Sequence, residues 1–332
     1  MKTLKKIVLL IIFTIFSFIL TGFNTTSTAV STDQFVGKVQ LGGDTIGIQI
    51  KTNIEVVGKY EIIVNNEKIK PWENSNINEG DFIYSIDNII VKTNQELNEV
   101  LRCTKKSQIP LVLIRNDKMI ETNINVIKNE NSNNSIGLYI KDHITGIGTL
   151  TFINPETNKY GALGHSVTDA LSQGSLYESS IKGVKKAIKG VPGEKYATLS
   201  HDKIGTIEIN NNIGIFGVYN KKMNSEYINV LKRENITTGK AEIVTVISGN
   251  IIKEYAIEIV EVAKQNNVDI KGIKFKVIDQ ELLSITGGVI QGMSGSPIIQ
   301  NGCLVGAVSH VLVNDPSIGY GVFAEWMYYN TK

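Results

Sequence analysis

The feature that most constrains the fold is the grouping of apolar residues in the C-terminal part of the chain. From Gly146 onward, short apolar runs alternate with Gly, Asn, Asp and Pro residues. Such spacing is typical of antiparallel strands and disfavours a parallel sheet. We therefore expect a mainly β domain, either two small barrels with a cleft between them or a sandwich. The candidate strands are Gly205–Ile209, Gly214–Tyr219, Glu242–Ile247, Tyr255–Val262, Lys274–Val277, Pro297–Ile299 and Val305–Val313.

Residues 36–128 combine several short strand patterns with one helix pattern. Asn94 can cap a helix in which Leu97, Val100 and Leu101 share one face. Short apolar or alternating runs precede and follow this helix, which indicates a small α+β domain.

The stretch Asn78–Val91 resembles a recurrent piece of bacterial PDZ domains. Such domains bind a peptide by adding it as a strand to a sheet edge. The Gly-rich pattern of the usual binding loop is missing from Ile54–Tyr60. Both a PDZ peptide ligand and a scaffold role therefore stay open.

The N-terminus is typical of a targeting segment. Lys2, Lys5 and Lys6 precede the uncharged apolar run Ile7–Phe23. Its length lies between a signal-peptide core and a transmembrane helix. We expect a retained signal anchor, with cleavage as the alternative, and a protein attached to the membrane by this segment with its domains outside the cytoplasm.

The polar segment Asn129–Ser135 has no apolar residue and is typical of a linker. The predicted organisation is then a signal anchor at 1–31, a PDZ-like domain at 32–128, a linker at 129–136 and a peptidase domain at 137–332.

The hexapeptide Gly292–Pro297 places one hydroxyl, that of Ser294, among small residues. Glycines allow positive φ and close backbone approach, so N–H groups can converge there. A serine nucleophile with an oxyanion hole needs this geometry, and the pattern resembles the nucleophile loop of chymotrypsin-like serine proteases. A turn without chemistry is the alternative interpretation.

A serine nucleophile needs a base, and His165 is the best candidate of four histidines. It follows an apolar stretch and Gly164, which suits an imidazole at the end of a strand. It also precedes Ser294 by more than a hundred residues, the chain order of chymotrypsin-like enzymes.

Four segments together resemble the stage IV sporulation protein B peptidases: Gly146–Phe152, Tyr160–His165, Gly287–Ile299 and Ala307–Pro316. The resemblance implies a PDZ domain, a chymotrypsin-like double β-barrel and a membrane tether. It also implies a serine endopeptidase that acts in sporulation without a cofactor. Such an enzyme cleaves a regulatory membrane protein in the intermembrane space of the forespore, which leads to activation of a late sigma factor. Autocleavage is a further expectation.

A triad also requires a carboxylate that orients the histidine. Asp169, Asp202, Asp269 and Asp279 are the candidates. The resemblance favours Asp279, whereas the usual spacing in chymotrypsin-like enzymes favours Asp202.

The remaining site residues follow from the serine-protease pattern. We expect the N–H groups of Gly292 and Ser294 to form the oxyanion hole. Ser309 and His310, on the following strand, are expected to edge a substrate-binding pocket, although they can equally be ordinary strand residues.

Two other functional classes stay open. An HtrA-like quality-control protease is disfavoured because its PDZ domain would follow the protease. A non-catalytic PDZ adaptor with a degenerate peptidase domain is disfavoured by Ser294 and His165. The net charge of +2 lacks a basic patch with interleaved aromatics, so no nucleic-acid partner is expected. Two cysteines without metal-ligand spacing predict no metal site.

Overall fold

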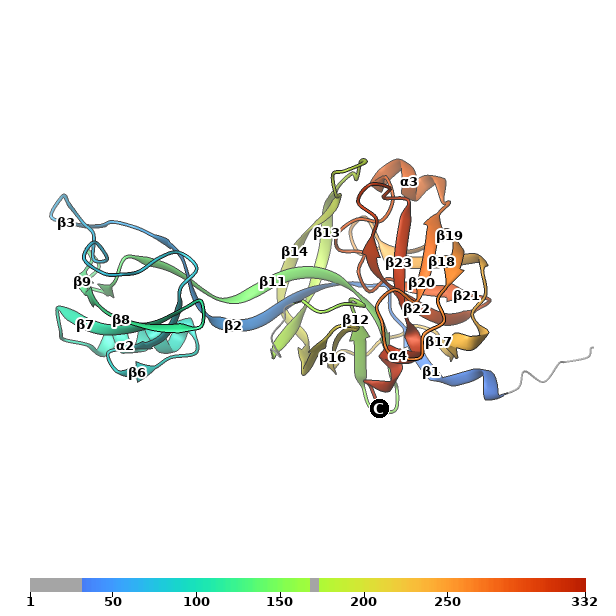
Figure 1. Ribbon diagram of the computed structural model, residues 1–332, viewed down its shortest axis with the longest axis horizontal. Helices are drawn as coiled ribbons and strands as arrows, with labels where there is room; N and C mark the ends of the chain where they lie inside the picture. Colours follow the sequence, from blue (N-terminus) through green and yellow to red (C-terminus); the bar gives the residue numbers. More distant parts are fainter. Residues whose placement is uncertain (1–31, 168–172) are drawn as a thin grey trace, which may run out of the picture. The chain divides into compact units, whose positions relative to one another are not determined.

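The computed structural model describes residues 32–167 and 173–332, and within them the chain is mainly β (Figure 1). The predicted anchor at 1–31 lies outside these residues. Among the helices of the described part, none has the length and apolar character needed to cross a bilayer.

Six strands of the C-terminal half form a closed antiparallel ring. Each strand pairs with the next, and β21 returns to β18. The predicted antiparallel barrel is therefore confirmed for this part of the chain. In ring order the strands are β18 (Gly239–Val246), β19 (Ile252–Val262), β20 (Ile273–Val277), β23 (Ile318–Phe323), β22 (Cys303–Val311) and β21 (Pro297–Gln300).

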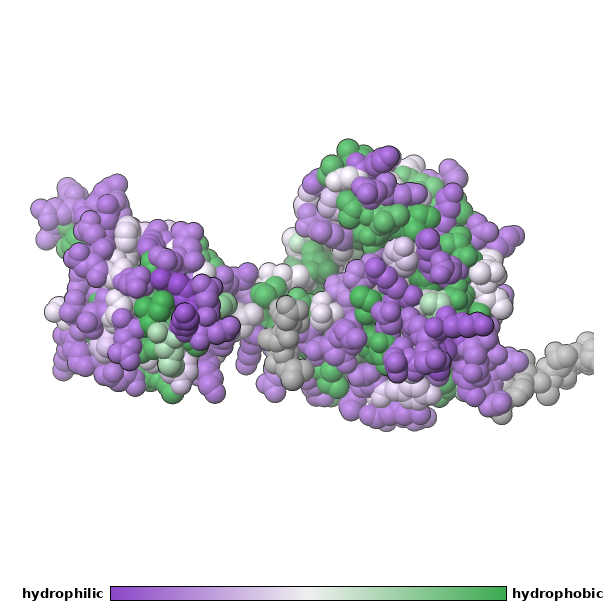
Figure 2. Space-filling model, in the orientation of Figure 1, coloured by the Kyte–Doolittle hydropathy of each residue, from purple (hydrophilic) through white to green (hydrophobic). Residues whose placement is uncertain are grey.

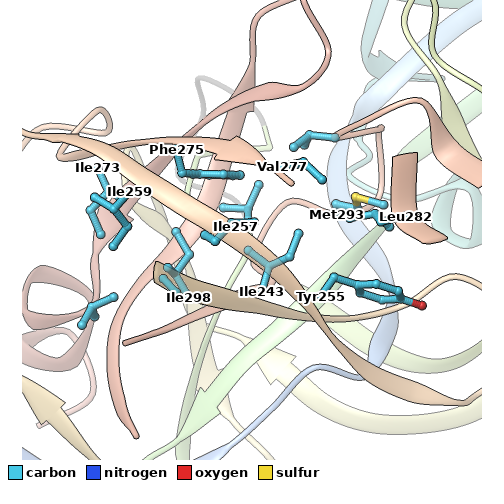
Figure 3. Packing of buried hydrophobic residues seen from close by; sticks show 14 of the residues in the cluster. Ile243, Tyr255, Ile257, Ile259, Ile273, Phe275, Val277, Leu282, Met293 and Ile298 are labelled. Carbon is cyan, nitrogen blue, oxygen red and sulfur yellow. The ribbon is translucent and has the colours of Figure 1, made fainter. Parts of the chain in front are cut away.

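The interior of this ring is filled by alternate side chains of its strands. Ile257, Phe275 and Ile298 are fully buried in one cluster. Figure 3 shows Met293 beside Val277 and Leu282 at one end of this cluster. Leu282 belongs to the short helix α3 (Gln280–Thr286), which the sequence analysis did not predict.

A second ring precedes the first along the chain. Its strands pair in sequence, and the isolated bridge Gly205↔Tyr219 completes the circle. The strands are the start of β2 (Thr45–Lys59), β11 (Leu138–Ile153), β12 (Lys159–Ala162), β16 (Gly214–Val218), β14 (Glu194–Ile207) and β13 (Gly174–Lys185). The short strand β15 (Ile209–Asn211) pairs with β16. A final helix, α4 (Ala324–Tyr329), follows β23.

The N-terminal strands differ from the predicted domain boundaries. β1 (Phe35–Leu41) pairs with β17 (Tyr227–Leu231) and with β11. Residues Ile46–Ile50 of β2 pair with both β11 and β13. Residues 35–50 thus belong to the peptidase strands, and the PDZ-like part is inserted between two neighbouring strands. The sequence did not reveal this because β2 continues without a break into the PDZ-like part.

The PDZ-like part starts where β2 reaches Ile54, which pairs with Ile83 of β5 (Phe82–Ile86). Its helix α2 (Asn94–Cys103) buries Leu97 and Leu101, as predicted, but its N-cap is Thr93, not Asn94. Its other strands are β3 (Ile62–Val64), β4 (Glu67–Ile69), β6 (Ile89–Ile90), β7 (Gln108–Arg115), β8 (Lys118–Asn125), β9 (Ile127–Lys128) and β10 (Asn134–Ser135).

Two further features bear on the predictions. The predicted linker contains β10, which pairs with β9, and Asn134 donates to the carbonyl of Leu101. In the peptidase part, apolar surface gathers where α3 lies (Figure 2). Exposed apolar side chains in this region include Ile188, Ile285 and Val313.

Candidate active site

The loop that carries Ser294 is held in an unusual backbone conformation. Gly292 and Gly295 both have φ of 90°, a region that side chains rarely adopt. Between them, Met293 points into the barrel core, where it is fully buried (Figure 3). The buried methionine therefore fixes the loop from inside, while Ser294 lines a pocket.

Two buried threonines of β11 hold the same loop from the other barrel. The Thr149 N–H donates to the Ser294 carbonyl at 2.8 Å, and its hydroxyl donates to the Gly292 carbonyl at 3.0 Å. The Thr151 hydroxyl donates to the Gly295 carbonyl at 2.7 Å. Sequence reasoning missed these residues. Their only signal was their place in Gly146–Phe152, a segment quoted for its resemblance.

The two N–H groups predicted to form the oxyanion hole are unengaged. Met293 N donates to Ile290 O at 3.1 Å, and Gly295 N donates to Val308 O at 2.7 Å. In the described part of the chain, the N–H groups of Gly292 and Ser294 have no protein acceptor. Two free donors flanking a committed one are the arrangement that an oxyanion requires.

His165 follows β12 through Leu163 and Gly164, which have φ of 70° and 69°. Its Nδ1 lies 2.7 Å from the Ser166 carbonyl oxygen. Because a carbonyl oxygen only accepts, Nδ1 carries the proton and Nε2 presents a lone pair. This is the tautomer that a general base for a serine needs.

Ser294 and His165 line one pocket with a volume of about 400 Å³. No hydrogen bond joins these two side chains in the described residues, and free enzymes often have such looser geometry. The rest of the wall is largely apolar and includes Val289, Ile290, Val308 and Val311. Ile48 of β2 and Ile147 of β11 also contribute.

None of the described candidate carboxylates contacts His165. Asp279 is the N-cap of α3: its Oδ1 accepts from Leu282 N at 2.9 Å, and its Oδ2 accepts from Ala256 N at 3.3 Å. Asp202 accepts from the Ser200 hydroxyl on exposed β14. Asp269 accepts from Ile270 N. Asp169 lies in residues 168–172, outside the described residues. The structure therefore assigns Asp279 a capping contact and does not place it beside the imidazole.

The two predicted substrate-binding residues differ in their surroundings. The Ser309 hydroxyl is buried and lies 2.8 Å from the Ile270 carbonyl and 3.2 Å from the Tyr320 carbonyl. His310 lines the pocket, with its ring centroid 5.7 Å from that of His165. Burial, reinforced by His165 and Lys271, lowers the pKa of His310, so the neutral ring is favoured.

The comparisons with known proteins agree with this geometry. The profile of the SpoIVB peptidase S55 family matches residues 132–328, and a PDZ domain profile matches residues 44–126. The chain belongs to the SpoIVB peptidase S55 family. It is a serine peptidase that carries a PDZ domain. A comparison with curated proteins finds no match.

Solved structures with partial similarity come from two bacteria. The active form of the Rv3671c protease from M. tuberculosis is 16% identical, covers 57% of this chain and 73% of its own, and has a TM-score of 0.33. Its inactive form is 18% identical, with 56% and 81% covered and a TM-score of 0.31. The PDZ domain of the SdrC-like protein from Listeria monocytogenes is 21% identical, covers 25% of this chain and 87% of its own, and has a TM-score of 0.20.

The capping role of Asp279 can be tested by substitution. Asn is as good an N-cap as Asp, so Asp279→Asn is expected to keep the rate of fluorophosphonate labelling within about tenfold. Loss of a triad carboxylate would instead lower turnover by about 10⁴-fold. Asp202→Asn is the matched control, and Asp279→Ala should lower the free energy of unfolding by about 1 kcal/mol. A 10⁴-fold loss specific to Asp279→Asn would restore the triad assignment.

Proposed function

We propose that this peptidase is an extracytoplasmic serine endopeptidase of sporulation signalling. In this proposal it cleaves a regulatory membrane protein and so triggers activation of a late sigma factor. Membership of the SpoIVB peptidase S55 family supports this role. The observation that carries the chemistry is the shared pocket of Ser294 and His165, beside two unengaged N–H groups.

The chemical steps follow from these groups. Ser294 Oγ attacks the carbonyl carbon of the scissile peptide bond, and His165 Nε2 takes the hydroxyl proton. The oxygen of the tetrahedral intermediate accepts from the N–H groups of Gly292 and Ser294. His165 then gives the proton to the leaving amine, and the C–N bond breaks. Water, deprotonated by His165, hydrolyses the acyl-enzyme and regenerates Ser294.

The proposal includes a chymotrypsin-like arrangement of the two rings. His165 follows a strand of the first ring, and Ser294 precedes a strand of the second. Thr149 and Thr151 of the first ring bind the nucleophile loop directly. A catalytic pair divided between two barrels is consistent with that architecture.

The pocket wall favours an apolar side chain on the acyl side of the scissile bond. Val289, Ile290, Val308 and Val311 line it, and neutral His310 adds no charge. A pocket of about 400 Å³ is large enough for a medium-sized or large apolar residue.

The PDZ domain and the N-terminal segment complete the proposal. The PDZ domain supports a protein substrate or a peptide ligand that adds to its sheet. Lys2, Lys5, Lys6 and the apolar run Ile7–Phe23 support attachment to the membrane as a signal anchor. Autocleavage near the polar residues after this run is part of the same proposal.

Labelling of the full-length protein with a fluorophosphonate tests the chemistry. Ser294→Ala should abolish labelling, and His165→Ala should slow it by about 10⁴-fold or more, because no other group activates the hydroxyl. Ser200→Ala, on the exposed part of β14, is the control for protein handling. A folded wild-type protein that does not label at pH 8 would favour a non-catalytic PDZ adaptor instead.

A further inference from the structure

Lys195 on β14 is a buried lysine that the mechanism does not use. Only 2% of its surface is exposed. Lysine is almost never fully buried without a charged partner. Within the described residues, however, no carboxylate forms an ion pair with Lys195. Such a costly arrangement invites a functional explanation.

The amine of Lys195 connects the two barrels. Its Nζ donates to the hydroxyl of Thr245 at 2.9 Å. Thr245 is fully buried on β18 of the second ring, whereas Lys195 belongs to the first. This hydrogen bond therefore spans the junction at which the catalytic groups meet.

The main chain and the stem of Lys195 hold the segment that leads into the nucleophile loop. Lys195 N donates to Gln291 O at 3.0 Å, and Gln291 N donates to Gly193 O at 3.0 Å. A Cβ atom on Gly292 would lie only 3.0 Å from Lys195 Cδ and 3.1 Å from its Cβ. The lysine stem thus packs directly on the residue that supplies one oxyanion donor.

We propose that Lys195 is a positioning residue for the oxyanion hole, with its stem fixing Gly292 and its amine joined to Thr245. The proposal rests on the serine-peptidase function described above. Lys195 acts through the backbone of Gly292 and does not touch the substrate in this proposal.

The environment of Lys195 favours the uncharged amine. Burial alone lowers the pKa of Lys195 to about 7. The groups packed against it, Thr245 and the Gln291–Gly292 backbone, carry no charge. The nearest charged residues along its own strand and along β18 are exposed Glu194 and the more distant Glu242 and Lys240.

Protonation would disturb this packing. An ammonium group has three N–H donors, and the single hydroxyl of Thr245 can satisfy one of them. The charged side chain therefore moves away from Thr245, and Gly292 moves with the stem. We expect the oxyanion hole to be assembled above pH 7 and to be lost progressively below it.

The pH dependence of labelling measures this effect. In the full-length wild type, the rate constant for fluorophosphonate labelling should fall with two protons at acid pH, one on His165 and one on Lys195. Lys195→Met keeps the apolar stem, so its rate should fall with one proton only. At pH 5.5 the wild type should lose about 30-fold more of its pH 8 rate than Lys195→Met, because each pH unit below the pKa removes tenfold of the neutral amine.

Unfolding gives a second readout that does not depend on activity. The pKa of Lys195 is lower in the folded chain than in the unfolded chain, so folding disfavours the proton. Its destabilising effect is complete below about pH 7 and fades as the pH rises toward the ordinary lysine pKa. In a Ser294→Ala background, Lys195→Met should therefore raise the melting temperature most at pH 6, with a smaller gain at pH 10.

Several outcomes would overturn the proposal. Equal steepness of the labelling profile in the wild type and Lys195→Met would do so. If Lys195→Met does not fold, Thr245→Val replaces it. Loss of the acceptor should move the second acid step to lower pH, and an unmoved step contradicts the proposal. Failure of the serine-peptidase function itself is distinct, since it would abolish labelling at pH 8 as well.

Discussion

A chain in which an Asn-Gly turn replaces residues 53–141 is expected to fold and to react with a fluorophosphonate, whereas residues 137–332 alone are expected to do neither. β2 and β11 are antiparallel and pair at Lys51↔His143. A two-residue Asn-Gly turn closes such a pair. The shortened chain then keeps β1, the start of β2 and the complete first ring.

The fragment 137–332 loses strands that the peptidase needs. Ile46, Ile48 and Ile50 are buried between β11 and β13, and Val39 of β1 is buried as well. Loss of each buried isoleucine costs about 2–5 kcal/mol, so the three together cost on the order of 10 kcal/mol. Typical domains have a total stability of only about 5–15 kcal/mol.

Circular dichroism melts and labelling of the two proteins measure the difference. A cooperative melt for the shortened chain and none for the fragment is the expected pair of results. A folded, reactive 137–332 fragment would show that β1 and β2 are dispensable.

Gly295→Ala is expected to abolish labelling and to lower the free energy of unfolding by about 3 kcal/mol or more. Its φ of 90° is strained for any other residue. An added Cβ would lie 2.1 Å from Thr149 O and 2.4 Å from Leu163 N. Both are backbone atoms, so relief requires moving β11 or the turn before His165.

Gly302→Ala is the matched control for this effect. Gly302 also has positive φ, at 71°, but its Cβ would meet open space. Only the backbone strain of about 1 kcal/mol should remain, with labelling unchanged. Chemical denaturation and labelling rates of both variants test the contrast. Equal effects of the two substitutions would show that packing at Gly295 does not hold the nucleophile loop.

The sequence was most informative where local chemistry demands particular residue types. Glycines around a serine predicted a strained loop, and the structure has that loop at Gly292–Gly295. A histidine after a strand, with Gly164 before it, predicted an imidazole at a strand end, and His165 lines the same pocket as Ser294. These features depend on neighbouring residues, which a sequence displays directly.

Contacts between distant segments could not be predicted in this way. The position of Asp279 before the serine cannot distinguish an N-cap from a triad member, because the short helix α3 has a weak pattern. Thr149 and Thr151 look like ordinary strand residues until β11 meets the nucleophile loop. Lys195 looks like a surface lysine until β14 closes behind Gly292.

The most direct test of the central claim is to map the fluorophosphonate adduct on the full-length protein by mass spectrometry. The account predicts one adduct at pH 8, on Ser294, because only this hydroxyl lies in the pocket with His165 and the free N–H groups of Gly292 and Ser294. An adduct on a different residue, or no adduct on folded protein, would contradict it.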